Sequence, residues 1–126
     1  MTVEFRHIIP VLRMFSVEKA HEFYIGFLDF TIDWEHRFGP DFPLHMQISR
    51  GRFLLHLTEH HGGPCPGGQV FVETTGLDAL YAELAAKNYR YNKPGIEDAP
   101  WDARTLTVTD PFANRIIFNE HNKPAN

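Results

Sequence analysis

Histidine has the widest chemical use of any residue type in this sequence, because a neutral imidazole can bind a metal or exchange hydrogen bonds near neutral pH. Of the eight histidines, His45, His56, His60 and His61 lie close together along the chain. The last two open the stretch HHGGPC, which ends at the single cysteine, Cys65. Structural zinc sites need paired ligands at tight spacings, and no second pair matches this one. We therefore expect His60 and His61 to be surface loop residues, and His45 and His56 to line a groove as neutral hydrogen-bonding groups.

Aromatic side chains in polar surroundings form a second candidate set. Trp34, Phe38 and Phe42 fall in a predicted strand and the loop after it, and Trp101 opens a later strand. Offset stacking on such rings is worth about 0.5–1.5 kcal/mol beyond burial, so several rings together could hold a planar ligand without any chemistry. Core packing is the alternative explanation for each ring, for Phe38 and Phe42 above all. Acidic residues that would attract a cation lie among them: Asp33, Glu35, Asp41 and Asp102.

The elements that position these residues begin with VEFRHIIPVL, residues 3–12, which is typical of a strand. Ser16 offers a helix N-cap, and apolar residues follow it at helical spacing as far as Leu28. Strands are expected near residues 30–37, 44–50 and 52–59, separated by the turn-like stretches FGPDFP and RG. In the last of these strands, His56 lies on the face opposite to Leu55 and Leu57.

A Gly- and Pro-rich stretch, residues 60–68, separates this half of the chain from a second half with the same element order. It consists of a strand near 69–75, a helix near 76–88 with Asn88 as its cap, a short segment at 89–92 and two strands within 100–120. We predict one α+β domain over residues 1–126, built of two βαβββ modules at about 4–60 and 69–121. The modules form curved mixed sheets around an open groove, with the helices on the outer face.

Composition and charge exclude several classes of function. The 12 basic and 16 acidic side chains give a formal net charge of −4, and no basic run appears, so nucleic acid is not an expected partner. A mildly acidic protein favours cationic ligands. No stretch is apolar for long enough to span a bilayer or to serve as the core of a signal peptide. The single cysteine cannot form an intramolecular disulfide, which suits a reducing compartment. We expect a cytoplasmic protein without a membrane partner.

Three stretches of the sequence resemble the vicinal oxygen chelate superfamily, which includes glyoxalase I and the bleomycin-resistance proteins, and they are most similar to the resistance branch. They are IIPVLRMFSVEKAHEFYIGFLDF at residues 8–30, GLDALYAEL at residues 76–84 and PWDARTLTVTDPFANRIIFNE at residues 100–120. Two glycines that are usual in the family are replaced, by Asp29 after the first helix and by Ala113 in the Asp-Pro-x-x-Asn turn. Because the second glycine often has a positive φ, Ala113 predicts a turn of slightly different conformation.

The resemblance also implies where a metal-dependent member of the superfamily would hold its divalent ion. Those positions fall on Ile9, with His7 close by, on His56, near Gln69 and on Ile117. An aliphatic side chain has no lone pair to donate, and an amide binds transition metals weakly. We therefore expect no metal, no other cofactor and no catalytic residues. In the alternative interpretation, a lyase, isomerase or dioxygenase would bind its metal through His7, His56 and Gln69.

Members of the resistance branch hold a large cationic glycopeptide drug between aromatic side chains, in grooves formed by two chains that often exchange the N-terminal strand. The resemblance thus implies a homodimer that sequesters a bleomycin-like antibiotic, or another bulky cationic aromatic ligand, without chemistry. A groove that binds a small metabolite, as a sensor or a scaffold, is a third interpretation. The expected ligand-binding residues are Trp34, Phe38, Phe42, His45, His56, Trp101 and Asp102.

Overall fold

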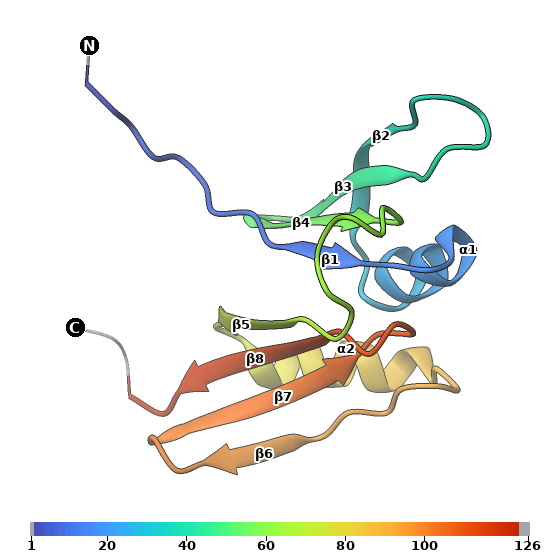
Figure 1. Cartoon of the computed structure of the whole chain (residues 1–126). Coiled ribbons are helices and arrows are strands. Elements are labelled where there is room, and N and C mark those ends of the chain that lie inside the picture. The colour runs from blue at the N-terminus through green and yellow to red at the C-terminus, as the bar shows by residue number, and fades with distance from the viewer. Residues whose placement is uncertain (1, 124–126) are drawn as a thin grey trace.

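Two four-stranded sheets make up the structure, a computed structural model that describes residues 2–123 (Figure 1). The first sheet has the strand order β1-β4-β3-β2 and the second the order β5-β8-β7-β6. In each sheet the first strand of the half runs parallel to the last, and the other neighbours are antiparallel. The predicted α+β fold, with a βαβββ order in each half and sheets that do not close, is confirmed. The strands are β1 (Val11–Arg13), β2 (Thr31–His36), β3 (His45–Arg50), β4 (Phe53–Thr58), β5 (Gln69–Glu73), β6 (Ile96–Ala99), β7 (Ala103–Thr109) and β8 (Arg115–His121), and the helical segments are α1 (Val17–Ala20), η1 (His21–Phe27) and α2 (Leu77–Lys87).

A single hydrophobic core joins the two halves. The first helical segment starts after Ser16, whose side chain accepts a hydrogen bond from the Lys19 backbone N–H, as predicted. It continues as the π-helix η1, and the apolar stripe predicted along it is buried. The ring of Phe53, at the start of β4, lies with its centroid 5.2 Å from that of Phe30 and 6.2 Å from that of Phe118 on β8. Through these edge-to-face contacts the hydrophobic core is continuous between the two sheets.

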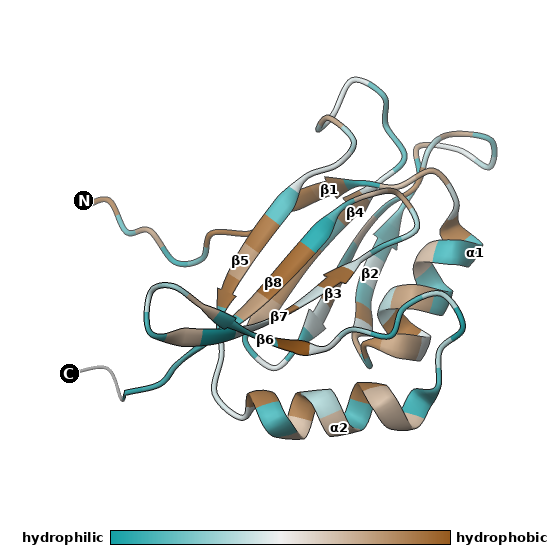
Figure 2. Cartoon of the chain, turned by 90° about the horizontal axis from the view of Figure 1, so that it is seen from below, coloured by the Kyte–Doolittle hydropathy of each residue, from teal (hydrophilic) through white to brown (hydrophobic). Residues whose placement is uncertain are grey.

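The second helix, α2, lies along one side of the structure, and hydrophobic and hydrophilic residues alternate along it (Figure 2). It buries Leu77 and Leu84 and ends at Asn88, which has the left-handed conformation expected of a C-terminal cap, with φ 48°. No helix within residues 2–123 is long and apolar enough to cross a membrane.

The Asp-Pro-x-x-Asn turn between β7 and β8 ties the second half to the first. Asp110 is buried and accepts hydrogen bonds from the backbone N–H groups of Phe112 and Asn114, each at 2.8 Å. Its carboxylate also accepts a hydrogen bond from the Tyr24 hydroxyl on η1 at 2.6 Å. Burial and the neighbouring carboxylate raise the pKa of Tyr24 well above its usual value, so the hydroxyl keeps the proton that it donates. The Asn114 amide extends the connection by donating to the Arg13 carbonyl at 2.7 Å.

The predicted strand over residues 3–12 is wrong in its extent. Only Val11–Arg13 pairs with β4, and the preceding residues 2–10, called here the N-terminal arm, extend away from the fold except at their end, where Ile9 and Pro10 are half-buried (Figure 1). The Pro10 carbonyl still accepts the His56 backbone N–H at 2.9 Å, but proline has no N–H with which to continue the ladder. Hydrophobic and hydrophilic residues alternate along the arm (Figure 2), and Phe5 and Ile8 are 94% and 96% exposed.

The segment at residues 89–92 is a turn, and the second strand of the second half is β6 at Ile96–Ala99. Tyr89 explains the difference, because it packs on the helix of the first half and not on a strand. Its ring centroid lies 4.7 Å from that of Phe27, and its hydroxyl donates to Glu22 at 2.9 Å.

The expected change of turn conformation at Ala113 is also wrong. Ala113 keeps the left-handed conformation that a glycine would adopt, with φ 70°, and so does Asp29, with φ 58°. Each is held by its neighbours. The Ala113 N–H donates to the Asp110 carbonyl, and the Asp29 carboxylate accepts the Lys87 ammonium at 2.6 Å.

Candidate functional site

The face of the first sheet that points away from the core carries a row of polar and aromatic side chains. On β3, Met46 and Ile48 are buried, so the alternation of a strand places His45, Gln47 and Ser49 on the opposite face. The register pairs Gln47 with His56 of β4 on one side and with Trp34 of β2 on the other. Cross-strand neighbours on one face lie within contact distance, which brings these side chains together.

Trp34 and the two histidines pack directly on one another. The Trp34 ring stacks on His45 with centroids 5.7 Å apart and planes 12° apart, and it meets His56 edge-on at 5.2 Å. His45 Nε2 lies 2.9 Å from His56 Nδ1 in a hydrogen bond. Trp34 keeps 42% of its surface exposed, so part of the indole is open to a ligand. The structure thus brings together three of the residues predicted to bind ligand.

Hydrogen bonds extend from this pair to Asp33. His56 Nε2 lies 3.0 Å from the Gln47 side-chain oxygen, and the Gln47 amide nitrogen donates to Asp33 at 3.0 Å. The Ser49 hydroxyl donates to the other Asp33 oxygen at 2.9 Å. We call these residues the histidine cluster: Asp33, Trp34, His45, Gln47, Ser49 and His56.

Both histidines of the cluster are held toward their neutral forms. Burial lowers the pKa of His56, and burial followed by the neighbouring His56, His60 and His36 lowers the pKa of His45. Neutral imidazoles can each accept one hydrogen bond and donate another, which is what a chain of such bonds requires. The cluster is therefore suited to recognition by hydrogen bonding and stacking at neutral pH.

Phe38 and Phe42 lie in the loop between β2 and β3, where neither packs in the core. Phe38 is 76% exposed and meets His36 edge-on, with centroids 4.8 Å apart, and Phe42 is also exposed. Core packing, the alternative explanation for these two rings, is therefore wrong. Arg37 fixes the loop by donating to the Phe42 carbonyl at 2.8 Å.

Trp101 and Asp102 lie on the other sheet, in the turn between β6 and β7. Figure 1 shows this turn and the β2–β3 loop at opposite corners of the molecule. Trp101 is half-exposed, donates its indole N–H to Asn119 at 2.7 Å and lies near Phe71, with ring centroids 6.4 Å apart. Asp102 has φ 58° and accepts from the Asn122 amide at 3.0 Å. Within one chain the predicted ligand-binding residues therefore form two separate groups.

The residues at the implied metal positions do not fit a divalent ion. Both ring nitrogens of His56 are used in hydrogen bonds, to His45 and to Gln47. Gln69 and Ile117 lie on the second sheet, opposite Arg115 and Phe71 respectively. His7 belongs to the exposed N-terminal arm. Across residues 2–123, no three His, Cys, Asp or Glu side chains gather closely enough to hold a metal.

A metal site at the position of Ile117 would need an acidic side chain on β8. Glu120 is an acidic residue of that strand, but it lies on the face opposite to Ile117. Burial alternates along β8 so that Ile117 and Asn119 share one face and Phe118 and Glu120 the other. The Glu120 carboxylate accepts the Gly76 N–H at the start of α2 at 2.7 Å, and it pairs with Arg104 at 3.1 Å. These bonds lower the pKa of Glu120, the Gly76 bond most, and they give the carboxylate a structural role at the helix.

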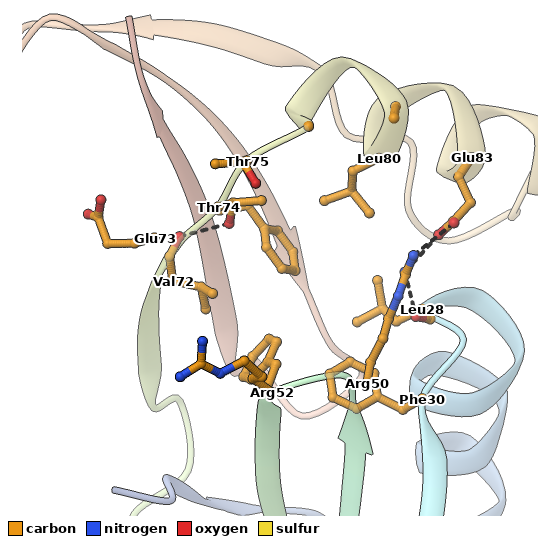
Figure 3. A pocket seen from close by; sticks show the side chains of 14 residues that line it. Leu28, Phe30, Arg50, Arg52, Val72, Glu73, Thr74, Thr75, Leu80 and Glu83 are labelled. Carbon is orange, nitrogen blue, oxygen red and sulfur yellow. Dashed lines mark hydrogen bonds and ion pairs between the residues drawn. The ribbon is translucent and has the colours of Figure 1, made fainter. Parts of the chain in front are cut away.

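A pocket of about 470 Å³ lies between the two halves, beside the first turns of α2 (Figure 3). Apolar side chains such as Leu80 and Phe30 line it, and Arg50 crosses it to pair with Glu83 at 2.7 and 2.8 Å. The same guanidinium donates to the Leu28 carbonyl at 3.0 Å. None of the residues predicted from sequence to bind ligand line this pocket, and its ion pair serves to hold α2 on the first half.

Gln47 and Ser49 also belong to the candidate site, although neither is among the residues predicted from the sequence. A signal for them was present, because His45, Gln47 and Ser49 alternate along one predicted strand, on the face opposite to Met46 and Ile48. The bulge between Ile32 and Trp34, which shifts the register of β2 against β3, gave no signal in the sequence.

Comparison with known proteins gives one family and many structures of the same fold. A family model described as a glyoxalase superfamily protein matches residues 1–125. No curated protein sequence matches the chain.

Several solved structures align over nearly the whole chain. The antibiotic binding protein TnmS3 from Streptomyces sp. CB03234 aligns with a TM-score of 0.73 and 21% identity, over 95% of this chain and 99% of its own. The bleomycin-binding protein of Streptomyces verticillus, in complex with copper(II)-bleomycin, aligns with a TM-score of 0.70 and 25% identity, over 93% of this chain and 97% of its own. A member of the glyoxalase/bleomycin resistance protein/dioxygenase superfamily from Sphaerobacter thermophilus aligns with a TM-score of 0.71 and 20% identity, over 93% of this chain and 98% of its own.

Proposed function

Since the chain belongs to the glyoxalase superfamily, whose members include both enzymes and binding proteins, we propose that it is a binding protein that sequesters a bulky cationic aromatic ligand. Bleomycin is the model for that ligand, because similar structures include a bleomycin-binding protein and an antibiotic binding protein. The ligand is held and released unchanged. The chain carries out this role in the cytoplasm.

The histidine cluster is the observation that carries the proposal. It offers a half-exposed indole for stacking on a sheet face that points away from the core, with a carboxylate, Asp33, beside it. Such a surface suits a planar cation, because stacking and charge act together on one ligand group. Among residues 2–123 this face gathers no set of His, Cys, Asp or Glu side chains for a metal, so we propose that binding needs none.

We propose further that the groove forms between two copies of the chain. The aromatic residues of the two sheets are separate within one chain, so a ligand that touches both Trp34 and Trp101 needs sheets from different copies. The exposed apolar residues of the N-terminal arm supply a surface for pairing, because Phe5 and Ile8 have little contact with their own chain. An arm exchanged between copies would cover them.

A fluorescence titration tests the proposal. The protein is dialysed against EDTA and titrated with metal-free bleomycin and with copper(II)-bleomycin, with tryptophan emission as the signal. We expect saturable binding of both forms in the presence of EDTA. Trp34→Ala should weaken binding by about tenfold or more, because it removes a stacking surface and its buried area. Tyr81→Ala, which removes an exposed aromatic ring on α2, is the matched control and should leave the affinity unchanged.

Two results would contradict the proposal. One is the absence of binding up to high micromolar bleomycin. The other is binding that disappears in EDTA and returns with a divalent metal, together with conversion of a ligand by the metal-loaded protein. The second result would favour the metal-dependent enzyme.

A further inference from the structure

The hydrogen bonds of the histidine cluster have a direction, and Asp33 sets it. An ionised carboxylate only accepts hydrogen bonds, so the Gln47 side chain must turn its NH₂ group toward Asp33. The Gln47 oxygen then faces His56 Nε2 at 3.0 Å. The Ser49 hydroxyl, which donates to the second Asp33 oxygen, leaves the carboxylate in place as an acceptor for Gln47.

This direction fixes the proton on each histidine. The Gln47 oxygen accepts, so His56 Nε2 carries the hydrogen, and a neutral imidazole then has a bare Nδ1. Bare His56 Nδ1 accepts from His45 Nε2 at 2.9 Å, so His45 carries its own hydrogen on Nε2. The remaining ring nitrogen, His45 Nδ1, is left with a free lone pair.

His45 Nδ1 is open to a ligand. It makes no hydrogen bond to any of residues 2–123, and it is not among the buried polar atoms without a partner in that range. It belongs to the ring on which Trp34 stacks, so an acceptor and an aromatic surface lie side by side. A free acceptor beside an indole can satisfy a planar group that carries N–H donors.

The charges around His45 are few. His36 and His60 lie near it, and Asp33 is the carboxylate joined to it through Gln47 and His56. Arg13 of β1 lies opposite Thr58, which pairs with His45, but its guanidinium rests over the Phe15 ring, 4.8 Å from the centroid. The fixed charge of the cluster is therefore negative, which favours a cation as the donor.

We propose that Asp33 is a positioning residue that acts through Gln47 and His56 to keep His45 Nδ1 unprotonated, and that His45 Nδ1 accepts a hydrogen bond from the ligand. The site thereby selects planar cations with N–H donors, such as amidinium groups and protonated heteroaromatic amines, over cations without them. This selectivity rests on the proposed function of the same face, whereas the proton order is a property of the ligand-free protein.

The proton order is tested in the ligand-free protein by long-range ¹H–¹⁵N correlation spectra of ¹⁵N-labelled histidine side chains at neutral pH. We expect both His45 and His56 to be Nε2–H tautomers. In Asp33→Asn the side chain can donate as well as accept, so the direction is no longer fixed and His45 should gain a measurable Nδ1–H population. Asp98→Asn makes the same chemical change at an exposed position of β6 on the other sheet and is the matched control, with the tautomers of the unaltered protein.

The ligand preference is tested with two aromatic cations of equal charge. Benzamidine carries N–H donors, and benzyltrimethylammonium carries none. We expect benzamidine to bind about tenfold tighter, the effect of one charge-assisted hydrogen bond, and to shift the His45 Nδ1 resonance. In Asp33→Asn the preference should shrink, because part of the His45 population then presents a donor to the ligand.

Each result decides one point. An Nδ1–H tautomer at His45 overturns the proton order, and an Asp33→Asn variant with unchanged tautomers overturns the role of Asp33 in setting it. Equal binding of the two cations, tighter binding of benzyltrimethylammonium, or no binding of either at millimolar concentration overturns the selectivity. Failure of bleomycin to bind while the tautomers are as expected contradicts the proposed function and leaves the proton order standing.

Discussion

At the scale of single residues, the His45–His56 pair makes stability depend on pH. Burial is the main cause that lowers the pKa of both rings below the ordinary 6.5. The unfolded chain therefore takes up these protons at a higher pH than the folded chain does. This pair costs no stability above about pH 6.5, and stability is lost as pH falls from 6.5 toward the folded pKa values.

Replacement of both rings should weaken this pH dependence of stability. We expect the urea midpoint of the unaltered protein to fall as pH is lowered through this range, and that of His45→Gln/His56→Gln to fall less steeply. Urea unfolding at a series of pH values gives the two slopes. His61→Gln, which changes an exposed loop histidine, is the control and should keep the original slope. Equal slopes in all three proteins would refute the assignment.

The residues of the site were predictable one at a time, but their grouping was not. Trp34, His45 and His56 follow from residue type and strand alternation, and they do come together. The role of Gln47 depends on which residues lie opposite it on the neighbouring strands. Its register against β2 is set by the bulge between Ile32 and Trp34. A bulge depends on pairing between distant segments, so the local sequence does not show it.

At the scale of elements, the turn between β7 and β8 stores strain at Ala113. Its φ of 70° is held by the hydrogen bonds of Asp110, and a residue with a Cβ is about 1–2 kcal/mol less stable there than glycine. Ala113→Gly gives up about 0.4–1 kcal/mol through the greater freedom of the unfolded chain. We expect a net gain in unfolding free energy of about 0.5–1 kcal/mol.

Chemical denaturation measures whether Ala113→Gly raises the unfolding free energy. Ala82→Gly, at an exposed position inside α2, is the matched substitution and should cost about 1 kcal/mol. Opposite signs for the same chemical change at the two sites would show that the backbone conformation is responsible. A loss of stability in both variants would mean that Ala113 is not strained.

Other elements show where local patterns stop being informative. The strands 31–36, 45–50 and 53–58 lie where apolar alternation and turn residues predicted them. The strand at 3–12 shortened to Val11–Arg13, because a stretch with strand propensity forms a strand only where a partner edge is available. Tyr89 packs on Phe27 of η1, 62 positions earlier in the sequence (89 − 27). No local pattern reveals a contact between residues so far apart.

At the scale of the whole molecule, the two sheets share a core but divide the candidate ligand-binding residues between them. Trp34 lies on the first sheet with its cluster, and Trp101 lies on the second beside Phe71. Under our proposal, one groove takes its first sheet from one copy and its second sheet from the other. Each copy then contributes one tryptophan to each of two grooves.

A titration of mixed variants shows directly whether a groove needs both copies. Trp34→Ala and Trp101→Ala chains, each impaired alone, are unfolded, mixed in equal amounts, refolded together and titrated with metal-free bleomycin. We expect full-affinity binding to recover at about a quarter of the grooves, because half the dimers are mixed and each mixed dimer has one groove with both tryptophans. Mixed protein that binds no better than the two variants measured separately would contradict it and place the site within a single chain.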